Sequence, residues 1–210
     1  MIIAGISIAC TSTGTERKGS VPVGVSDTIA AKAPADKGKQ APAASMTSDR
    51  KAKGGTLNLA FVGDIMPGTT FPDSRLPEKD GATLFKDVDS ILTAADVAAG
   101  NMEGALADEG ETTKKGGKFS YSFRVPTRYG KLIADAGFDF MSMANNHAFD
   151  FGLDGVKSTE ATLHSNGIAY SGIGGRKESA IVERKGVRYG FCAFGHNSYT
   201  LKHADLENVK

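Results

Sequence analysis

The chain has 210 residues, of which 40% are hydrophobic, and its 25 Lys and Arg side chains nearly balance 24 Asp and Glu. This balance excludes the strongly basic surface on which many nucleic-acid-binding proteins depend. No apolar stretch is long enough to cross a membrane as a helix, and two cysteines exclude a disulfide-rich scaffold.

Residues 1–10 are similar to a bacterial lipoprotein signal segment, in which an apolar run ends in a small residue before a cysteine that becomes acylated. Ala9 precedes Cys10 here, so we expect Cys10 to be the lipidation site. No positive residue precedes the run, and an ordinary cytoplasmic tail is the alternative interpretation. With Cys10 modified, Cys192 is left alone in an apolar strand, which predicts a buried thiol.

Residues 11–54 are rich in Ala, Ser, Thr, Lys, Gly and Pro without an apolar period, which predicts a disordered linker. This linker carries eight Lys or Arg and four Asp or Glu, a net charge of +4. Residues 55–210 carry 17 basic and 20 acidic side chains, a net charge of −3, and are long enough for one domain core. The predicted organisation is therefore a signal segment, a linker and a single domain.

Two predicted strands each lead into a carboxylate. The first covers residues 57–62 and is followed by Asp64 in a turn rich in Gly and Pro. An amphipathic helix over residues 84–95 precedes the second strand, over 97–100, which leads into Asn101-Met102-Glu103. Taken alone, Asp64 would more often be a turn residue that accepts backbone hydrogen bonds.

A Gly- and Lys-rich stretch over residues 108–118 predicts a mobile loop that folds over the site, although solvent exposure alone explains its composition. The alternating residues 119–123 then predict a strand that leads to Arg124. A guanidinium at this point could hold a phosphate or a carboxylate in its fork of donors. An arginine in solvent on an edge strand is an equally open interpretation.

Residues 143–152 gather two amides, an imidazole and a carboxylate directly after a predicted strand over 138–144. A helix over 153–166 follows, and in open α/β sheets ligands bind where strands end in this way. Asn145-Asn146-His147 could instead cap that helix. Asp150 either caps the helix or orients the ring of His147.

Helix and strand signals alternate through the domain, with further strands over 168–171 and a hairpin over 180–194. This alternation predicts an α/β fold with helices on both faces of a sheet. The polar residues at three strand ends form an inventory of oxygen and nitrogen ligands that suits Mn, Mg, Zn or Fe.

At these residues the chain resembles the poly-gamma-glutamate capsule biosynthesis proteins of CapA type, in the calcineurin-like metallophosphoesterase superfamily, over residues 56–200. The segments that carry the resemblance are Gly63-Asp64-Ile65-Met66, Asn101-Met102-Glu103, Phe123-Arg124-Val125-Pro126, Ala136-Gly137-Phe138-Asp139, Ala144 to Gly152 and Gly172-Ile173-Gly174. The resemblance implies a three- or four-layer metallophosphoesterase-like sandwich, of which this chain holds the N-terminal part.

The resemblance also implies a divalent metal, held by Asp64, Glu103 and Asn146. His147 would be the proton donor or transition-state stabiliser. Asn101, beside Glu103, would be the other catalytic residue. Met66 stands where the superfamily has a histidine, which leaves the number and identity of the metals open.

Three further roles are expected around this centre. Arg124 and Asn145 are the candidates for substrate contacts, and Asp150 is the candidate for orienting His147. Family members run on beyond this length into two histidine-containing segments that complete the metal site, and neither is found in this sequence. His196, after the hairpin, is similar to one of them and is a weaker candidate ligand.

Two functional hypotheses follow from the resemblance. The first is an enzyme of the cell envelope, lipid-anchored outside the cytoplasm, that acts on an anionic polymer or phosphoester together with capsule-synthesis machinery. The second is a catalytically inactive fragment, or a non-enzymatic envelope binding or assembly subunit, that keeps the fold. No nucleic-acid partner is expected.

Overall fold

The structure is a computed structural model that describes residues 2–6, 56–117 and 120–202. The expected lipidation site Cys10 and the expected linker over 11–54 lie outside the described residues. Ile2–Ile6, within the expected signal segment, form the short strand β1.

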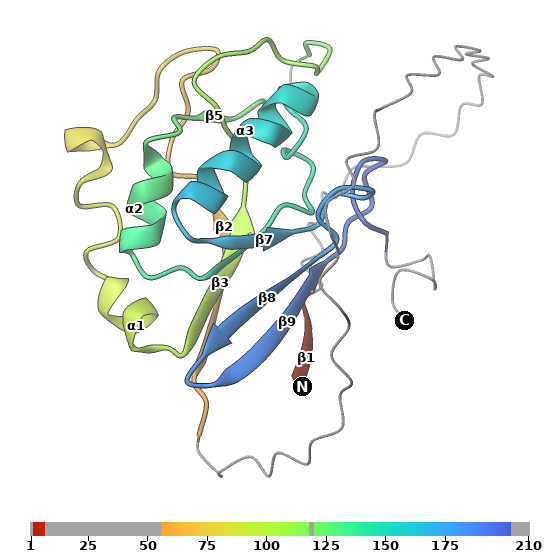
Figure 1. The fold of residues 1–210 in the computed structure, drawn as a ribbon. Coiled ribbons are helices and arrows are strands. Elements are labelled where there is room, and N and C mark those ends of the chain that lie inside the picture. The colour runs from red at the N-terminus through yellow and green to blue at the C-terminus, as the bar shows by residue number, and fades with distance from the viewer. Residues whose placement is uncertain (1, 7–55, 118–119, 203–210) are drawn as a thin grey trace, which may run out of the picture. The chain divides into compact units, whose positions relative to one another are not determined.

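A parallel four-stranded sheet forms the centre of the domain, with its strands in the order β2-β3-β6-β7 (Figure 1). These strands are β2 Leu59–Ile65, β3 Val97–Met102, β6 Phe140–Ser142 and β7 Ala169–Ser171. Every neighbouring pair is parallel, which confirms the α/β class. Parallel pairing also brings the carboxyl ends of all four strands to the same edge of the sheet, where ligands bind in such folds.

Three helices cover one face of this sheet (Figure 1). They are α1 Asp89–Ala94, α2 Tyr129–Asp135 and α3 Gly152–Ser165. Successive side chains of a strand point to opposite faces, so only alternate residues of β3 and β6 reach the helices. Met102 and Met141 do so and pack in one core with Ile133 and Leu163.

The opposite face is covered by a second sheet, where helices were expected. Its strands are β8 Ser179–Arg184 and β9 Val187–Ala193, which form an antiparallel hairpin, and β1, which pairs with β9 in parallel. Val97 and Phe140 point to this side and pack with Tyr189 and Phe191. The rings of Phe140 and Phe191 stack with their centroids 4.5 Å apart. The described domain is therefore a layer of helices, a parallel sheet and a second sheet.

The amphipathic helix expected over residues 84–95 begins only at α1, after a short 3-10 turn η1 Glu78–Gly81 and further turns. Leu84, Val88 and Ile91 are exposed, so these apolar residues bury no face of a helix. Tertiary packing supplies most of the stability of a short helix, and of the large apolar residues in this stretch only Phe85 and Leu92 pack against the core, which explains the later start.

β2 is an outer strand of the parallel sheet, and among the described residues no strand pairs with its outer edge. Leu59, Phe61 and Val62 on this strand are between 37% and 47% exposed, whereas every residue of β3 is buried. An uncovered sheet edge with apolar side chains favours association with another strand.

Two further strands, β4 Ala105–Leu106 and β5 Arg124–Val125, form a short parallel pair. They join the chain that leaves β3 to the chain that enters α2. Of the helices described, none has the length and apolar character needed to cross a bilayer.

Two leucines on α3 test this core. Leu163 is fully buried and Leu153 is 45% exposed. We expect Leu163→Ala to lower the free energy of unfolding by about 2–5 kcal/mol, because it leaves a cavity. Leu153→Ala should lower it by about 0.5 kcal/mol or less. Urea unfolding measures both values, and equal losses would contradict this packing.

Candidate functional site

Polar side chains meet where β2, β3 and β6 end. Asp64 near the end of β2 lies opposite Asn101 on β3, and Asn101 lies opposite Ser142 on β6. The register between β2 and β3 shifts between Phe61 and Asp64, as in a β-bulge. Bulges often occur beside functional sites because they redirect a side chain. The sheet therefore brings together strand ends that lie far apart in the sequence.

The side-chain amide of Asn101 links the two carboxylates of the site. Its Nδ2 atom donates to Asp64 Oδ1 at 2.8 Å and to Glu103 Oε2 at 3.0 Å. Asn145 Nδ2 donates to Asn101 Oδ1 at 2.9 Å and to the backbone oxygen of Met102 at 2.8 Å. These bonds fix which way the Asn101 amide points, because its oxygen must face Asn145. Its donor group is then directed at the carboxylates.

The ring of His147 lies on the other side of Glu103. Its Nε2 atom is 3.6 Å from Glu103 Oε1, and its Nδ1 atom is 2.8 Å from Asp150 Oδ2. The ring of Phe123 packs against it with the centroids 4.4 Å apart. The backbone N–H of His147 donates to Asn145 Oδ1 at 2.9 Å. The imidazole is thus held at Nδ1 and on one face, with Nε2 turned toward Glu103.

Asp150 is fully buried behind His147 and is not the cap of α3, whose first turn has no side-chain cap. Its Oδ2 atom accepts a hydrogen bond from the backbone N–H of Phe123 at 2.8 Å. Its Oδ1 atom forms an ion pair with Lys114 Nζ at 2.6 Å. Of the two expectations for Asp150, its contacts fit the orientation of His147.

Burial raises the pKa of Glu103, since a desolvated carboxylate favours its neutral form. The positive charge of protonated His147 opposes this rise and the negative charge of Asp64 adds to it. Burial also raises the pKa of Tyr199 to about 12. Its hydroxyl, 3.4 Å from the backbone oxygen of Asn145, is therefore a donor at neutral pH.

Four other residues singled out from the sequence are exposed or half-buried. Asn146 is exposed, and its neighbour Asn145 makes the buried contacts. His196 is exposed in the bend after β9, and Met66 is 41% exposed. Cys192 is a half-buried free thiol whose pKa is raised by burial.

The guanidinium of Arg124 is held within the protein. Its Nε donates to Thr70 Oγ1 at 3.1 Å and its Nη1 to the backbone oxygen of Gly110 at 2.9 Å. The same group lies 5.6 Å from the ring centroids of both Phe71 and Phe151. These contacts hold Arg124 between loops rather than free in solvent, and its contact with a substrate stays a prediction.

Sequence reasoning did not assign roles to three residues that contact the network: Lys114, Phe123 and Tyr199. Lys114 lies in a stretch with Lys115 and several glycines, where no pattern distinguishes one lysine from the next. The contact of Lys114 with Asp150 joins positions 36 residues apart, which periodicity cannot reveal.

The donor atoms of the site are of the types that a hard or borderline cation prefers, because Asp64 and Glu103 offer carboxylate oxygens and His147 offers a ring nitrogen. Two carboxylates that share one amide donor also leave lone pairs for a cation. Within the described part of the chain, however, no three or more His, Cys, Asp or Glu side chains form a group that could hold a metal ion. The types of donor atom at the site therefore fit a metal ion, but few such side chains come together among the described residues.

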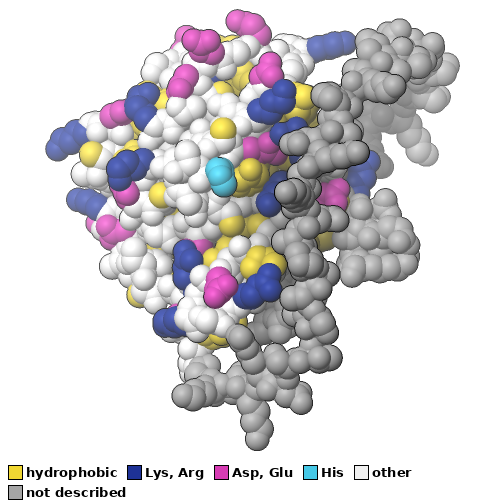
Figure 2. Space-filling model, viewed as in Figure 1, with side chains coloured by type: hydrophobic (Ala, Val, Ile, Leu, Met, Phe, Trp, Pro, Cys, Tyr) yellow, Lys and Arg dark blue, Asp and Glu magenta, His cyan; other side chains and the backbone are white. Residues whose placement is uncertain are grey.

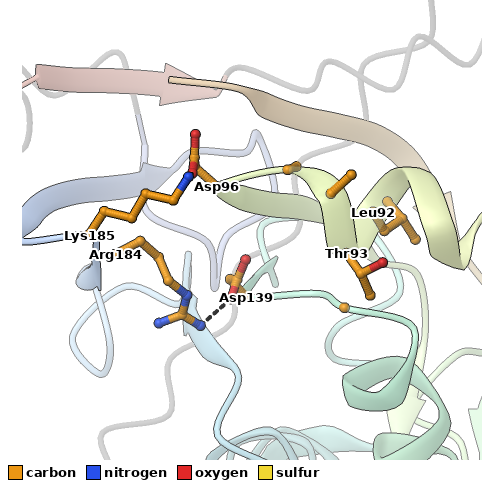
Figure 3. A pocket seen from close by; sticks show the side chains of 9 residues that line it. Leu92, Thr93, Asp96, Asp139, Arg184 and Lys185 are labelled. Carbon is orange, nitrogen blue, oxygen red and sulfur yellow. Dashed lines mark hydrogen bonds and ion pairs between the residues drawn. The ribbon is translucent and has the colours of Figure 1, made fainter. Parts of the chain in front are cut away.

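A cavity of about 400 Å³ lies elsewhere, where α1 leads into β3 and the β8–β9 turn approaches (Figure 3). Two ion pairs border it, between Arg184 and Asp139 and between Lys185 and Asp96. Both cationic side chains that line this cavity, Arg184 and Lys185, are thus paired with carboxylates of the protein. One face of the molecule likewise shows charges of both signs interspersed (Figure 2).

Comparison with known proteins identifies one family. The model of the family described as "Bacterial capsule synthesis protein PGA_cap" matches residues 58–209. The PGA biosynthesis protein CapA of Bacillus subtilis (strain 168) is 29% identical over 143 residues, which are 66% of this chain and 37% of that protein. The capsule biosynthesis protein CapA of Bacillus anthracis is 27% identical over 119 residues, 56% of this chain and 28% of that one.

An uncharacterised protein of Sinorhizobium fredii (strain NBRC 101917 / NGR234), y4sH, is 31% identical over 132 residues, which are 61% of this chain and 27% of that protein. The chain thus spans between about a quarter and two fifths of the length of these curated relatives.

The raised pKa of Glu103 predicts a pH dependence of stability. The folded protein holds a proton on Glu103 more tightly than the unfolded chain does. Stability should therefore fall as the pH rises from the ordinary glutamate pKa of 4.5 through the raised folded value. We expect Glu103→Gln, with metal chelated, to raise the melting temperature at about pH 7 and to change it little at about pH 3.5.

The exposed Glu109 supplies the matched control, since Glu109→Gln should leave the melting temperature unchanged at both pH values. A Glu103→Gln effect of the same size at both pH values would contradict the assigned cause.

Proposed function

The chain belongs to the family of bacterial capsule synthesis proteins, PGA_cap, and from this premise we propose that it takes part in capsule synthesis through a metal-dependent phosphoesterase-like site. One similar protein is named for the biosynthesis of PGA and another for capsule biosynthesis. We therefore propose poly-gamma-glutamate, or a phosphoester linked to its handling, as the substrate class.

One observation carries the proposal: a single amide, that of Asn101, holds the carboxylates of Asp64 and Glu103 within hydrogen-bond reach of the same nitrogen. Two carboxylates this close repel each other, which raises the free energy of ionising both. A divalent cation between them would offset that repulsion. Asp64 and Glu103 would hold this cation, which would be Mn, Zn, Fe or Mg. The bound metal would supply polarisation of a phosphoryl oxygen and a water of lowered pKa.

The remaining residues of the site prepare the chemistry around the carboxylates. His147 holds its Nε2 atom toward Glu103, where a proton on that nitrogen can pass to a departing oxygen. Asn145 fixes the side-chain amide of Asn101, and Asp150 fixes the imidazole ring of His147. Asn146 is exposed beside His147, which makes its amide available to a metal or a substrate.

We place the protein in the cell envelope. The capsule names of the two relatives support this location. An apolar segment that ends at Cys10 supports a lipid anchor at that residue. Capsule-synthesis machinery is the proposed partner.

A second candidate function is that of a non-enzymatic binding or assembly subunit. The small ligand set among the described residues favours it, as do the internal hydrogen bonds that engage the amide groups of both Asn101 and Asn145. In this role the same residues at the strand ends would bind a carboxylate-rich ligand without cleaving it.

Metal content and hydrolysis distinguish the two candidates. We expect the purified chain to bind at least about half an equivalent of Mn, Zn or Fe and to hydrolyse an aryl phosphate diester. Asp64→Asn and Glu103→Gln should each lower metal content and rate about tenfold or more, because each removes a ligand. Mass spectrometry of the metal and a colorimetric assay measure both quantities.

Asp135→Asn is the matched control, since this carboxylate lies on the surface of α2 in an ion pair with Lys131. Less than about half an equivalent of metal together with no hydrolysis would favour the binding subunit.

A further inference from the structure

At the outer edge of β2, the backbone groups of two residues point away from the sheet. Asn58, the residue before β2, donates its N–H to Asp96 Oδ2 at 2.8 Å and accepts from the Asp96 N–H at 2.7 Å. Both polar backbone groups of Asn58 therefore point toward the chain that enters β3. Neighbouring residues of a strand direct these groups to opposite edges, so those of Leu59 and Phe61 point outward. Within the described part of the chain, no strand pairs with them there.

The same two residues carry exposed apolar side chains. Ala60 between them packs with the core on the helix side, so Leu59 and Phe61 point to the other face of the sheet. Among the described residues, most of the exposed large hydrophobic side chains lie between Leu59 and Ile91, on β2 and on its connection to β3. Exposed apolar side chains that gather on one part of a protein often mark an interaction surface.

The sequence of this edge does little to prevent pairing. Residues 57–63 contain no charged side chain and no proline, which are two of the devices that protect edge strands. A β-bulge is a third such device, but the shift in register of β2 lies after Phe61. The regular part of the strand, which ends at Phe61, is therefore suited to pairing with another strand.

This regular part is complementary to a second copy of itself. In an antiparallel pair with its two-fold axis at Ala60, Leu59 lies opposite Phe61 of the partner subunit on both sides of the axis. Both residues point their backbone groups at this edge, so each such pair can exchange two hydrogen bonds. The large side chains meet on one face of the joined sheet and the small Ala60 side chains on the other. No like charges oppose each other in this register.

We propose that the outer edge of β2 is a dimerisation surface, where β2 of a second copy of this chain pairs in antiparallel register around Ala60. The pairing joins the parallel sheets of two subunits into one, in the two-fold arrangement that is commonest among oligomers. It depends on the backbone and the apolar side chains of β2 and is independent of the proposed function.

Sedimentation velocity of the full chain with a reducing agent tests the dimer, over protein concentrations from about 1 to about 100 µM, a range typical of weak dimers. We expect the wild type to dimerise as the concentration rises. Phe61→Lys should weaken dimerisation at least about tenfold, because it places a charge in both cross-strand pairs. Ile181→Lys is the matched control, since Ile181 on β8 is 55% exposed and Phe61 is 47% exposed. It should leave dimerisation unchanged.

Two opposite charges test the register. Leu59→Lys and Phe61→Glu should each weaken dimerisation of the single variant, and an equal mixture of the two variants should associate again. In the mixture, the register around Ala60 places the introduced ammonium opposite the introduced carboxylate. A register centred on Phe61 would keep these charges apart, so a mixture that fails to associate overturns the proposed pairing.

Hydrogen exchange of the wild type reports on the edge without any substitution, and it decides if the variants do not fold. The N–H groups of Leu59 and Phe61 should exchange slowly in the dimer and rapidly when dilution separates the subunits. A chain that stays monomeric up to about 100 µM overturns the proposal. Equal effects of Phe61→Lys and Ile181→Lys also overturn it. Slow exchange of both N–H groups in a monomer would show that another part of the same chain covers the edge, which contradicts the dimer as well.

Discussion

The site depends on one shared hydrogen-bond donor, the side-chain amide of Asn101. It connects a carboxylate on an outer strand, Asp64, to a buried one, Glu103, and it is itself held by Asn145 from the loop after β6. A buried amide that meets all its partners is rigid, because any rotation would leave a donor or an acceptor unsatisfied. The positions of both carboxylates therefore follow from the pairing of β2, β3 and β6.

The layers around the parallel sheet explain why this network can be so polar. Met102 and Met141 pack with the helices and Phe140 packs with the hairpin, so the sheet gains its stability from apolar contacts on both faces. Next to these apolar contacts lie buried polar groups, Asn101 near the end of β3 and Asp150 in the loop before α3. The cost of burying these two polar groups is met by their hydrogen bonds and by an ion pair.

Much of this arrangement could be predicted from the sequence. The remaining contacts could not, for reasons that particular residues show. Alternation located the first central strand and short apolar runs located the next two. Parallel topology then led us to expect Asp64, Glu103 and His147 at one edge of the sheet. Neighbouring amides are harder, because sequence alone does not tell which of Asn145 and Asn146 points inward. The position of Arg124 depends on loops that carry Thr70 and Gly110, and loop contacts leave no periodic signal.

Because β2 has an open edge, the carboxylates of Asp64 and Glu103 are not fixed equally firmly by the fold. Asp64 belongs to a strand that is covered on one side only, whereas Glu103 follows a strand enclosed by two neighbours. Local opening begins where few apolar contacts resist it, so β2 can detach while β3 and β6 stay paired. Such fraying would release Asp64 from its amide and spare the contact between Glu103 and His147. A strand that paired with the open edge of β2 would therefore also hold the carboxylate of Asp64 in place.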